Sequence, residues 1–205
     1  HIPLTTRGRG TGTTGGSVPT EGGIVLSLEK MDKILEIDAK NRLARVQPGV
    51  INQTLQDAVD EYNLFWPPDP SSSNYCTIGG NLANNSAGPR AIKYGTPREN
   101  TLALSAVAGS GELLKTGVST TKSVVGLDLT RLLIGSEGTL AIITEATLKM
   151  LPKNEAIGML QAFYTDIDSA ATAVIDMMAQ SVVPYTLEFI DDQSIQLIQS
   201  FSGAS

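Results

Sequence analysis

Ten residues near the start of the chain, Arg7–Gly16, hold five glycines, two arginines and no acidic residue. Glycine permits positive φ and lets successive backbone N–H groups converge on one point, where with a nearby guanidinium they suit a phosphate or pyrophosphate. A flexible linker is the alternative, but linkers are usually richer in serine and do not follow a β-branched strand such as the one expected at residues 2–6. The pattern therefore predicts an anion-binding loop.

The same loop contains Gly10-x-Gly12-x-x-Gly15, which matches the dinucleotide fingerprint of the doubly wound fold. That fingerprint requires a helix to begin directly after the turn. Residues 17–23 instead contain a proline and a Gly-Gly pair, and the apolar run that follows is typical of a strand. We therefore exclude the doubly wound fold and expect the loop itself to hold the phosphate.

The composition is that of a globular chain of 205 residues, 41% apolar, with a net charge of −6. The negative charge, with no Lys/Arg cluster to offset it, argues against nucleic acid as a partner. The single cysteine, Cys76, excludes an internal disulfide and a thiolate metal site and suits a reducing compartment. It is not expected to be a catalytic nucleophile, because His1 is the only histidine.

No apolar run approaches the roughly 18 residues of a membrane span, and no signal-peptide pattern is present. The chain begins at His1 without a methionine and stops just after a helical pattern. We therefore expect it to be an interior fragment of a longer protein.

A proline-rich stretch at residues 65–73, FWPPDPSSS, excludes both a helix and a central strand. Such a rigid loop can present Asp69 and three serine hydroxyls to a ligand at a low cost in conformational entropy. A plain connector is the alternative.

Small residues and amides dominate the segment at residues 77–88. Thr77 is expected to cap a short helix in which Gly79–Gly80 lets a flat ligand approach the backbone, while Asn81 and Asn84 offer amide donors and acceptors. Together with the phosphate loop, this segment predicts a ligand that has both a phosphate and a planar heterocycle.

The remaining pattern predicts a mixed α+β scaffold. Strands are expected at residues 24–28, 34–38, 42–47, 101–108 and 112–116, and helices at residues 50–62 and 128–134. A third glycine turn, Gly135–Gly138, leads into a strand that runs to about Met150. After Pro152 the pattern changes to a strand at 156–163, a helix capped by Asp166 or Asp168, a strand at 183–190 and a helix at 191–201.

Five motifs occur in one order along the chain: Arg-Gly-x-Gly-Thr-Gly-x-x-Gly-Gly, Pro-Asp-Pro-Ser-Ser, Gly-Gly-Asn, Lys-Tyr-Gly and Gly-Ser-Glu-Gly-Thr-Leu. In this order they resemble the FAD-binding domain of the vanillyl-alcohol oxidase, or PCMH-type, flavoproteins, in the branch of glycolate oxidase FAD-linked subunits and D-lactate dehydrogenases. The resemblance spans residues 1–205. It implies an α+β fold in which residues 1–152 form a two-subdomain FAD-binding domain, truncated at its N-terminus, and residues 153–205 begin a substrate-binding cap domain.

The resemblance also implies the residues that bind FAD. Those expected around the pyrophosphate are Arg7, Gly8, Arg9, Gly10, Thr11, Gly12, Gly15 and Gly16. Those expected along the ribityl and isoalloxazine side are Pro68, Asp69, Ser72, Thr77, Gly79, Gly80, Asn81 and Asn84. Those expected to complete the pocket towards the adenine are Gly88, Tyr94, Glu137, Gly138, Ile142 and Ile143.

Four positions, in three places along the chain, depart from the pattern of this family. Relatives with a covalent flavin carry the linking histidine where this chain has Thr11, so non-covalent FAD is expected. Many relatives have Ala-Gly-Gly where this chain has Ser86-Ala87-Gly88, and glycine where it has Ala141. These replacements are small, so we expect shifted contacts with the flavin and not a loss of binding.

The function that the resemblance implies is FAD-dependent oxidation of a D-2-hydroxy acid, such as glycolate, D-lactate or D-2-hydroxyglutarate, to the 2-oxo acid by hydride transfer to flavin N5. The implied partners are this acid and an electron acceptor, which is a quinone, an electron-transfer protein or an iron-sulfur subunit. No catalytic or metal-binding residue is expected within the chain, because the catalytic histidine and a divalent metal site of this branch belong to the remainder of the cap. This chain alone is accordingly expected to show no turnover.

The implied location is cytoplasmic, with peripheral attachment to a membrane as an alternative. Two other functions stay open. One is that of a flavoprotein resembling UDP-N-acetylenolpyruvoylglucosamine reductase, which shares this FAD domain. The other is that of a non-catalytic binding module that keeps the fold.

Overall fold

The computed structural model describes residues 2–202 and shows the expected α+β architecture. A five-stranded antiparallel sheet has the order β3-β4-β8-β6-β7. Its strands are β3 (Ile34–Asp38), β4 (Leu43–Val46), β6 (Thr101–Ala108), β7 (Leu113–Gly117) and β8 (Ala141–Lys149). All five lie where the sequence predicted strands.

Two further strands, β1 (Leu4–Arg7) and β2 (Ile24–Ser27), pair in parallel with each other. The glycine-rich segment that joins them contains no helix, so the exclusion of the doubly wound fold is confirmed. A third, short pairing joins β5 (Leu64–Phe65) to β9 (Leu151–Pro152), which the sequence did not predict. It ties the start of the proline-rich loop to the end of the large sheet.

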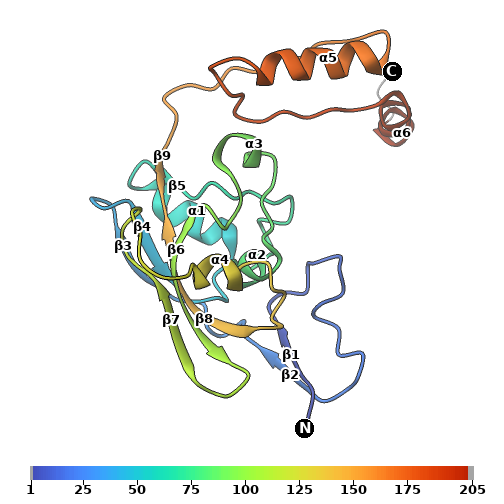
Figure 1. Ribbon diagram of the computed structural model, residues 1–205. Coiled ribbons are helices and arrows are strands. Elements are labelled where there is room, and N and C mark those ends of the chain that lie inside the picture. Colours follow the sequence, from blue (N-terminus) through green and yellow to red (C-terminus); the bar gives the residue numbers. More distant parts are fainter. Residues whose placement is uncertain (1, 203–205) are drawn as a thin grey trace.

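Helices α1 (Asn52–Asp60) and α2 (Ile78–Asn84) pack beside the sheet and bury its core (Figure 1). Leu55 and Val59 from α1 are fully buried, as are Ile78 and Leu82 from α2. The short helices α3 (Ala91–Tyr94) and α4 (Leu129–Leu133) complete the body.

The largest fully buried side chain of the core is Trp66. It follows β5, and its indole Nε1 donates to the carbonyl of Asn100 at 3.1 Å. Trp66 therefore fixes the start of the proline-rich loop in the core.

Helices α5 (Ile167–Met178) and α6 (Asp192–Ser202) lie outside this body, at the far end of an extended connection (Figure 1). Both begin where the sequence predicted, because each start is local chemistry. Asp166 accepts the N–H of Ser169 at 2.8 Å, and Asp191 accepts that of Ser194 at 2.8 Å. Asp166, not Asp168, is thus the cap of α5.

The strands predicted at residues 156–163 and 183–190 are wrong, since both segments are extended but unpaired. A strand needs a neighbour to bond its N–H and C=O groups, and no strand among residues 2–202 lies beside either segment. Their apolar side chains are correspondingly exposed, Met159 at 97% and Leu160 at 89%. Alternation in the sequence predicts a strand only where a partner is present.

Candidate functional site

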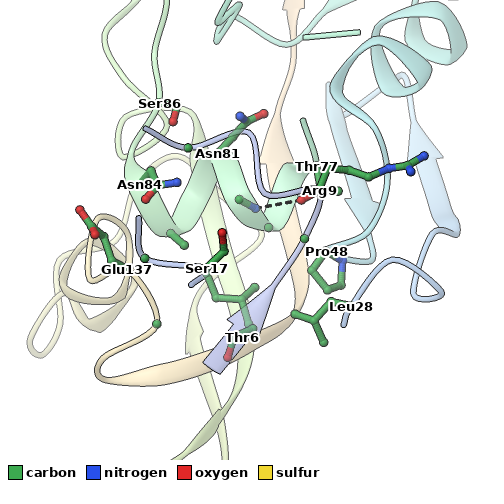
Figure 2. Close-up of a pocket in the computed structure, with 18 of the residues that line it drawn as sticks. Thr6, Arg9, Ser17, Leu28, Pro48, Thr77, Asn81, Asn84, Ser86 and Glu137 are labelled. Carbon is green, nitrogen blue, oxygen red and sulfur yellow. Dashed lines mark hydrogen bonds between the residues drawn. The ribbon is translucent and has the colours of Figure 1, made fainter. Parts of the chain in front are cut away.

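Three segments far apart in the sequence meet around one cleft: the glycine loop after β1, helix α2 and the glycine turn before β8 (Figure 2). The cleft and its open mouth together hold about 1010 Å³ of space not filled by protein atoms, part of which is open solvent. Sixteen of the twenty-two predicted cofactor residues line it, namely Gly8, Arg9, Gly10, Thr11, Gly12, Gly16, Ser72, Thr77, Gly79, Gly80, Asn81, Asn84, Glu137, Gly138, Ile142 and Ile143.

The glycine loop lies against α2 so closely that side chains would not fit between them. A Cβ at Gly8 would stand 2.4 Å from Thr77 Oγ1, and one at Gly12 would stand 3.2 Å from Asn84 Nδ2. Gly10 has a φ of +66°, a conformation that L-residues with side chains rarely adopt. The glycines therefore bring the loop backbone up to one wall of the cleft, as the anion-binding prediction requires.

Helix α2 starts in the way that its sequence predicted. The hydroxyl of Thr77 accepts the N–H of Gly80 at 3.2 Å and is almost fully buried. Asn81, buried to 2% exposure, and the exposed Asn84 both reach the cleft from the next turn. Polar amides thus stand beside a backbone that carries no bulky side chain at Gly79 or Gly80.

The third glycine turn is fixed to the C-terminal end of α2. The N–H of Gly135 donates to the carbonyl of Leu82 at 2.9 Å, and the N–H of Glu137 donates to that of Ala83 at 2.9 Å. Glu137 has a φ of +52°, and its carboxylate accepts the hydroxyl of Thr14 at 3.4 Å. This contact joins the first and third glycine segments across the cleft.

The cleft has two charged side chains among the described residues that line it. Arg9 and Glu137 lie towards opposite sides of α2 in Figure 2. Arg9 is paired with Glu29 outside the cleft, with 3.1 Å between Nη1 and Oε2. The cleft is therefore lined mainly by backbone and neutral polar groups.

Six predicted residues do not line the cleft: Arg7, Gly15, Pro68, Asp69, Gly88 and Tyr94. Gly15 belongs to the glycine loop and has a φ of +80°. The guanidinium of Arg7 lies beneath Gly10, 3.3 Å from the place that a Cβ there would take. Gly88 has a φ of +86°, and a Cβ there would collide with the backbone of Asp69.

Asp69 links the proline-rich loop to Arg90, outside the cleft. Its carboxylate pairs with Arg90 at 2.9 Å and also accepts the backbone N–H of Arg90 at 3.1 Å. Burial raises the pKa of Asp69 above its usual value, although Arg90 opposes the shift. The Arg90 guanidinium lies over the rings of Phe65, at 5.4 Å, and Tyr185, at 5.8 Å. Tyr94 packs edge-on against the same two rings.

Sequence reasoning missed seven residues that line the cleft: Thr6, Thr14, Ser17, Leu28, Pro48, Ala83 and Ser136. Thr14, Ser17 and Ser136 lie within or beside glycine segments that were already singled out. No local pattern marks Leu28 or Pro48, because they reach the cleft only through tertiary packing. Pro48 lies 2.6 Å from where a Cβ on Gly79 would stand, which explains the need for glycine in α2.

Residues 2–202 contain no group of three or more His, Cys, Asp or Glu side chains placed to hold a metal ion. No helix among them is long and apolar enough to cross a membrane. His1 lies outside the described residues.

The sequence also matches two known families. Residues 1–117 match the FAD binding domain, and residues 153–205 match the C-terminal domain of FAD linked oxidases. Among curated proteins, the glycolate oxidase subunit GlcD of Bacillus subtilis is 47% identical over 98% of this chain and 43% of its own length. The D-lactate dehydrogenase of Archaeoglobus fulgidus is 42% identical over 98% of this chain and 45% of its own length.

Among solved structures, an alkyldihydroxyacetonephosphate synthase is similar with a TM-score of 0.65 and 28% identity, over 76% of this chain and 30% of the synthase. The chain spans less than half the length of the two curated relatives named above. The family match covers more than half of the chain and the whole glycine loop. The chain therefore belongs to the PCMH-type family of FAD-binding flavoproteins, as its motifs predicted.

Proposed function

We propose that the protein containing this chain oxidises a D-2-hydroxy acid with FAD bound non-covalently in the cleft. The observation that carries the proposal is the convergence of three glycine segments on one cleft whose wall leaves no room for side chains at Gly8 and Gly12. The relatives named as glycolate oxidase subunits and D-lactate dehydrogenases support the substrate class.

The cleft fits this cofactor in its chemistry. The N–H groups of the loop Gly8–Gly12 suit a pyrophosphate. The amides of Asn81 and Asn84 and the hydroxyl of Ser72 suit the polar edge of a heterocycle or a polyol chain. The remaining predicted residues of the cofactor site belong to the same proposal. Thr11 stands where some relatives have the histidine that links covalently to the flavin, and its hydroxyl cannot form a histidyl bond.

When bound, FAD supplies the hydride acceptor, which no amino-acid side chain provides. This chain contributes the binding and orientation of the cofactor and the exclusion of water by the packed wall of α2. We assign the deprotonation of the substrate hydroxyl, the fixing of its carboxylate and any metal site to the part of the relatives that this chain does not cover. We further propose that the reduced flavin passes its electrons to a quinone, an electron-transfer protein or an iron-sulfur subunit.

We also propose a domain division at Pro152. Residues 1–152 then form the FAD-binding domain, and residues 153–205 begin the cap. In support, the body of the fold ends with β9 (Leu151–Pro152), and a different family match begins at residue 153.

The test is to purify the full-length protein, record its flavin absorption and mix it without oxygen with D-lactate, glycolate or D-2-hydroxyglutarate. We expect a yellow protein whose flavin is bleached by one of these acids and not by L-lactate. A colourless protein that cannot be reconstituted with FAD would overturn the proposal. A yellow protein that none of the acids bleaches would support the binding module or the reductase.

One substitution tests where FAD binds in the cleft. Gly12→Asp adds bulk 3.2 Å from Asn84 Nδ2 and a negative charge where we place the pyrophosphate. We expect flavin content to collapse while the far-ultraviolet circular dichroism stays unchanged. Normal flavin occupancy in this variant would show that the cofactor lies elsewhere.

A further inference from the structure

Helix α1 carries two linked polar side chains, the buried Asn52 and the half-buried Gln56. Asn52, in the first turn of α1, has no exposed surface. The sequence of residues 50–62 predicted an amphipathic helix and gave no sign of a buried amide. Gln56, one turn later, donates to the carbonyl of Trp66 at 2.7 Å and accepts the N–H of Trp66 at 3.2 Å. It also donates to Asn52 Oδ1 at 3.4 Å. A buried side chain with polar partners is retained for its hydrogen bonds and not for its apolar area.

Asn52 bonds directly to a residue that lines the cleft. Its Nδ2 donates to Asn81 Oδ1 at 2.9 Å and to the carbonyl of Pro68 at 3.3 Å. The backbone N–H of Asn52 donates to the carbonyl of Cys76 at 3.0 Å. One side chain therefore touches both α2 and the proline-rich loop.

Two residues bond the Asn81 amide. Its oxygen accepts from Asn52 Nδ2 at 2.9 Å, whereas Cys76 Sγ contacts both ends, at 3.2 Å from Nδ2 and 3.6 Å from Oδ1. An amide can rotate by half a turn only by exchanging a donor for an acceptor. A thiol can donate or accept, so Cys76 suits either orientation of the amide, whereas the Asn52 Nδ2 donor requires the Asn81 oxygen. The Asn52 donor therefore fixes the orientation of the Asn81 side chain in the wall of the cleft.

We propose that Asn52 is a positioning residue of the cofactor site, which holds the Asn81 amide and the proline-rich loop in the geometry that binds FAD. This inference rests on the proposed function. Asn52 does not itself line the cleft, so its effect on FAD passes through Asn81 and through the loop that carries Ser72.

The test compares Asn52→Leu with Asn100→Leu in the full-length protein. Asn100 is a matched control because it is equally buried and its Nδ2 donates to the carbonyls of Tyr94 and Thr96, both at 2.9 Å, yet it lies outside the cleft. Both variants should lower the melting temperature of the apoprotein. Only Asn52→Leu should raise the Kd for FAD, by about tenfold, which corresponds to about 1.4 kcal/mol, and shift the absorption maximum of the bound flavin.

The route through Asn81 is tested by a double-mutant cycle on the Kd for FAD. With Asn81→Leu in place, the further change Asn52→Leu should have a much smaller effect, because the amide that it orients is gone. If Asn52→Leu does not fold, Asn52→Ser gives the same comparison with a side chain too short to bridge both partners.

Three outcomes would overturn the inference. These are an unchanged Kd in the Asn52 variant, equal increases in the Asn52 and Asn100 variants, or a full effect of Asn52→Leu when Asn81 is already replaced. If the unsubstituted protein fails to bind FAD, the proposed function fails together with the inference. Normal binding by the unsubstituted protein with any of the three outcomes overturns the inference alone.

Discussion

The contact between Gly8 and Thr77 allows one substitution to be worked out from the structure. A Cβ at Gly8 would stand 2.4 Å from Thr77 Oγ1, a separation that real Cβ atoms do not tolerate. Gly8 is not among the residues with positive φ, so an alanine there meets no backbone strain of that kind. The hydroxyl of Thr77 must therefore move, and it then releases the N–H of Gly80 at the start of α2.

The size of the effect follows from the loss of this cap. Replacing a capping threonine by alanine costs about 1 kcal/mol, within a range of about 0.5–2 kcal/mol. We expect Gly8→Ala to lower the free energy of unfolding by about that amount. We also expect it to weaken FAD binding by about tenfold, since a displaced loop no longer aligns its N–H groups. Gly8→Ala combined with Thr77→Ala should cost little more than Thr77→Ala alone, because the colliding oxygen is absent.

Urea unfolding of the apoprotein and quenching of FAD fluorescence measure the two quantities. Gly109→Ala is the matched control, because a Cβ there meets no atom within 4 Å and its φ is not positive. That variant should leave both quantities unchanged. Strictly additive costs of the Gly8 and Thr77 changes would refute the reasoning, since they would show that the two residues do not interact.

Three shorter predictions concern other parts of the chain. Because Thr11 stands where a linking histidine would be, acid precipitation of the yellow protein should release the flavin into the supernatant; flavin on the pellet would contradict this. Hydrogen bonds from Ser169 lower the pKa of Asp166, so this cap is present above the ordinary carboxyl pKa and is lost as the pH falls through the lowered value. The protection factor of the Ser169 amide, its exchange rate relative to the intrinsic rate at each pH, should decrease over that fall but change less in Asp166→Asn, and equal pH profiles of the protection factor would exclude the cap. Tyr185→Leu should increase proteolysis at residues 179–191, the segment between α5 and α6 that carries this ring, because the Arg90 guanidinium lies over it, whereas Tyr185→Phe should not; identical digestion would show that this contact does not hold the segment.

Local chemistry explains what the sequence predicted well. The start of α2 depends on Thr77 and Gly80, three residues apart, and the start of α5 depends on Asp166 and Ser169 at the same spacing. The five strands of the large sheet are short apolar segments bounded by turn residues, and this local pattern predicts a strand without reference to which strand lies beside it. The glycine segments could be predicted as binding loops because such a density of glycine in a folded chain is needed in few other kinds of structure.

Long-range packing explains what the sequence did not predict. Leu28 and Pro48 line the cleft because the chain folds back past it, and neither has a distinctive neighbour in the sequence. Asn52 lies among apolar positions of α1, where only the structure shows that its partner is Asn81. The strand pattern at residues 156–163 fails for the opposite reason, since its local signal is clear but no partner strand lies beside it.

The charge of the cleft bears on how an acidic chain accommodates an anion. The chain carries a net charge of −6, and the one basic side chain among the described cleft residues, Arg9, is paired with Glu29. Both partners are about half exposed, so solvent screens the pair. Because Glu29 also neutralises Arg9, this arginine adds little to the electrostatic attraction of an anion into the cleft. In the site that we propose, attraction for phosphate comes from backbone N–H dipoles at Gly8–Gly12, in a loop that packs against Thr77 and α2, and from the Arg7 guanidinium next to Gly10. Dipoles act only at short range, which is why this site needs glycine at the positions where the loop meets the wall.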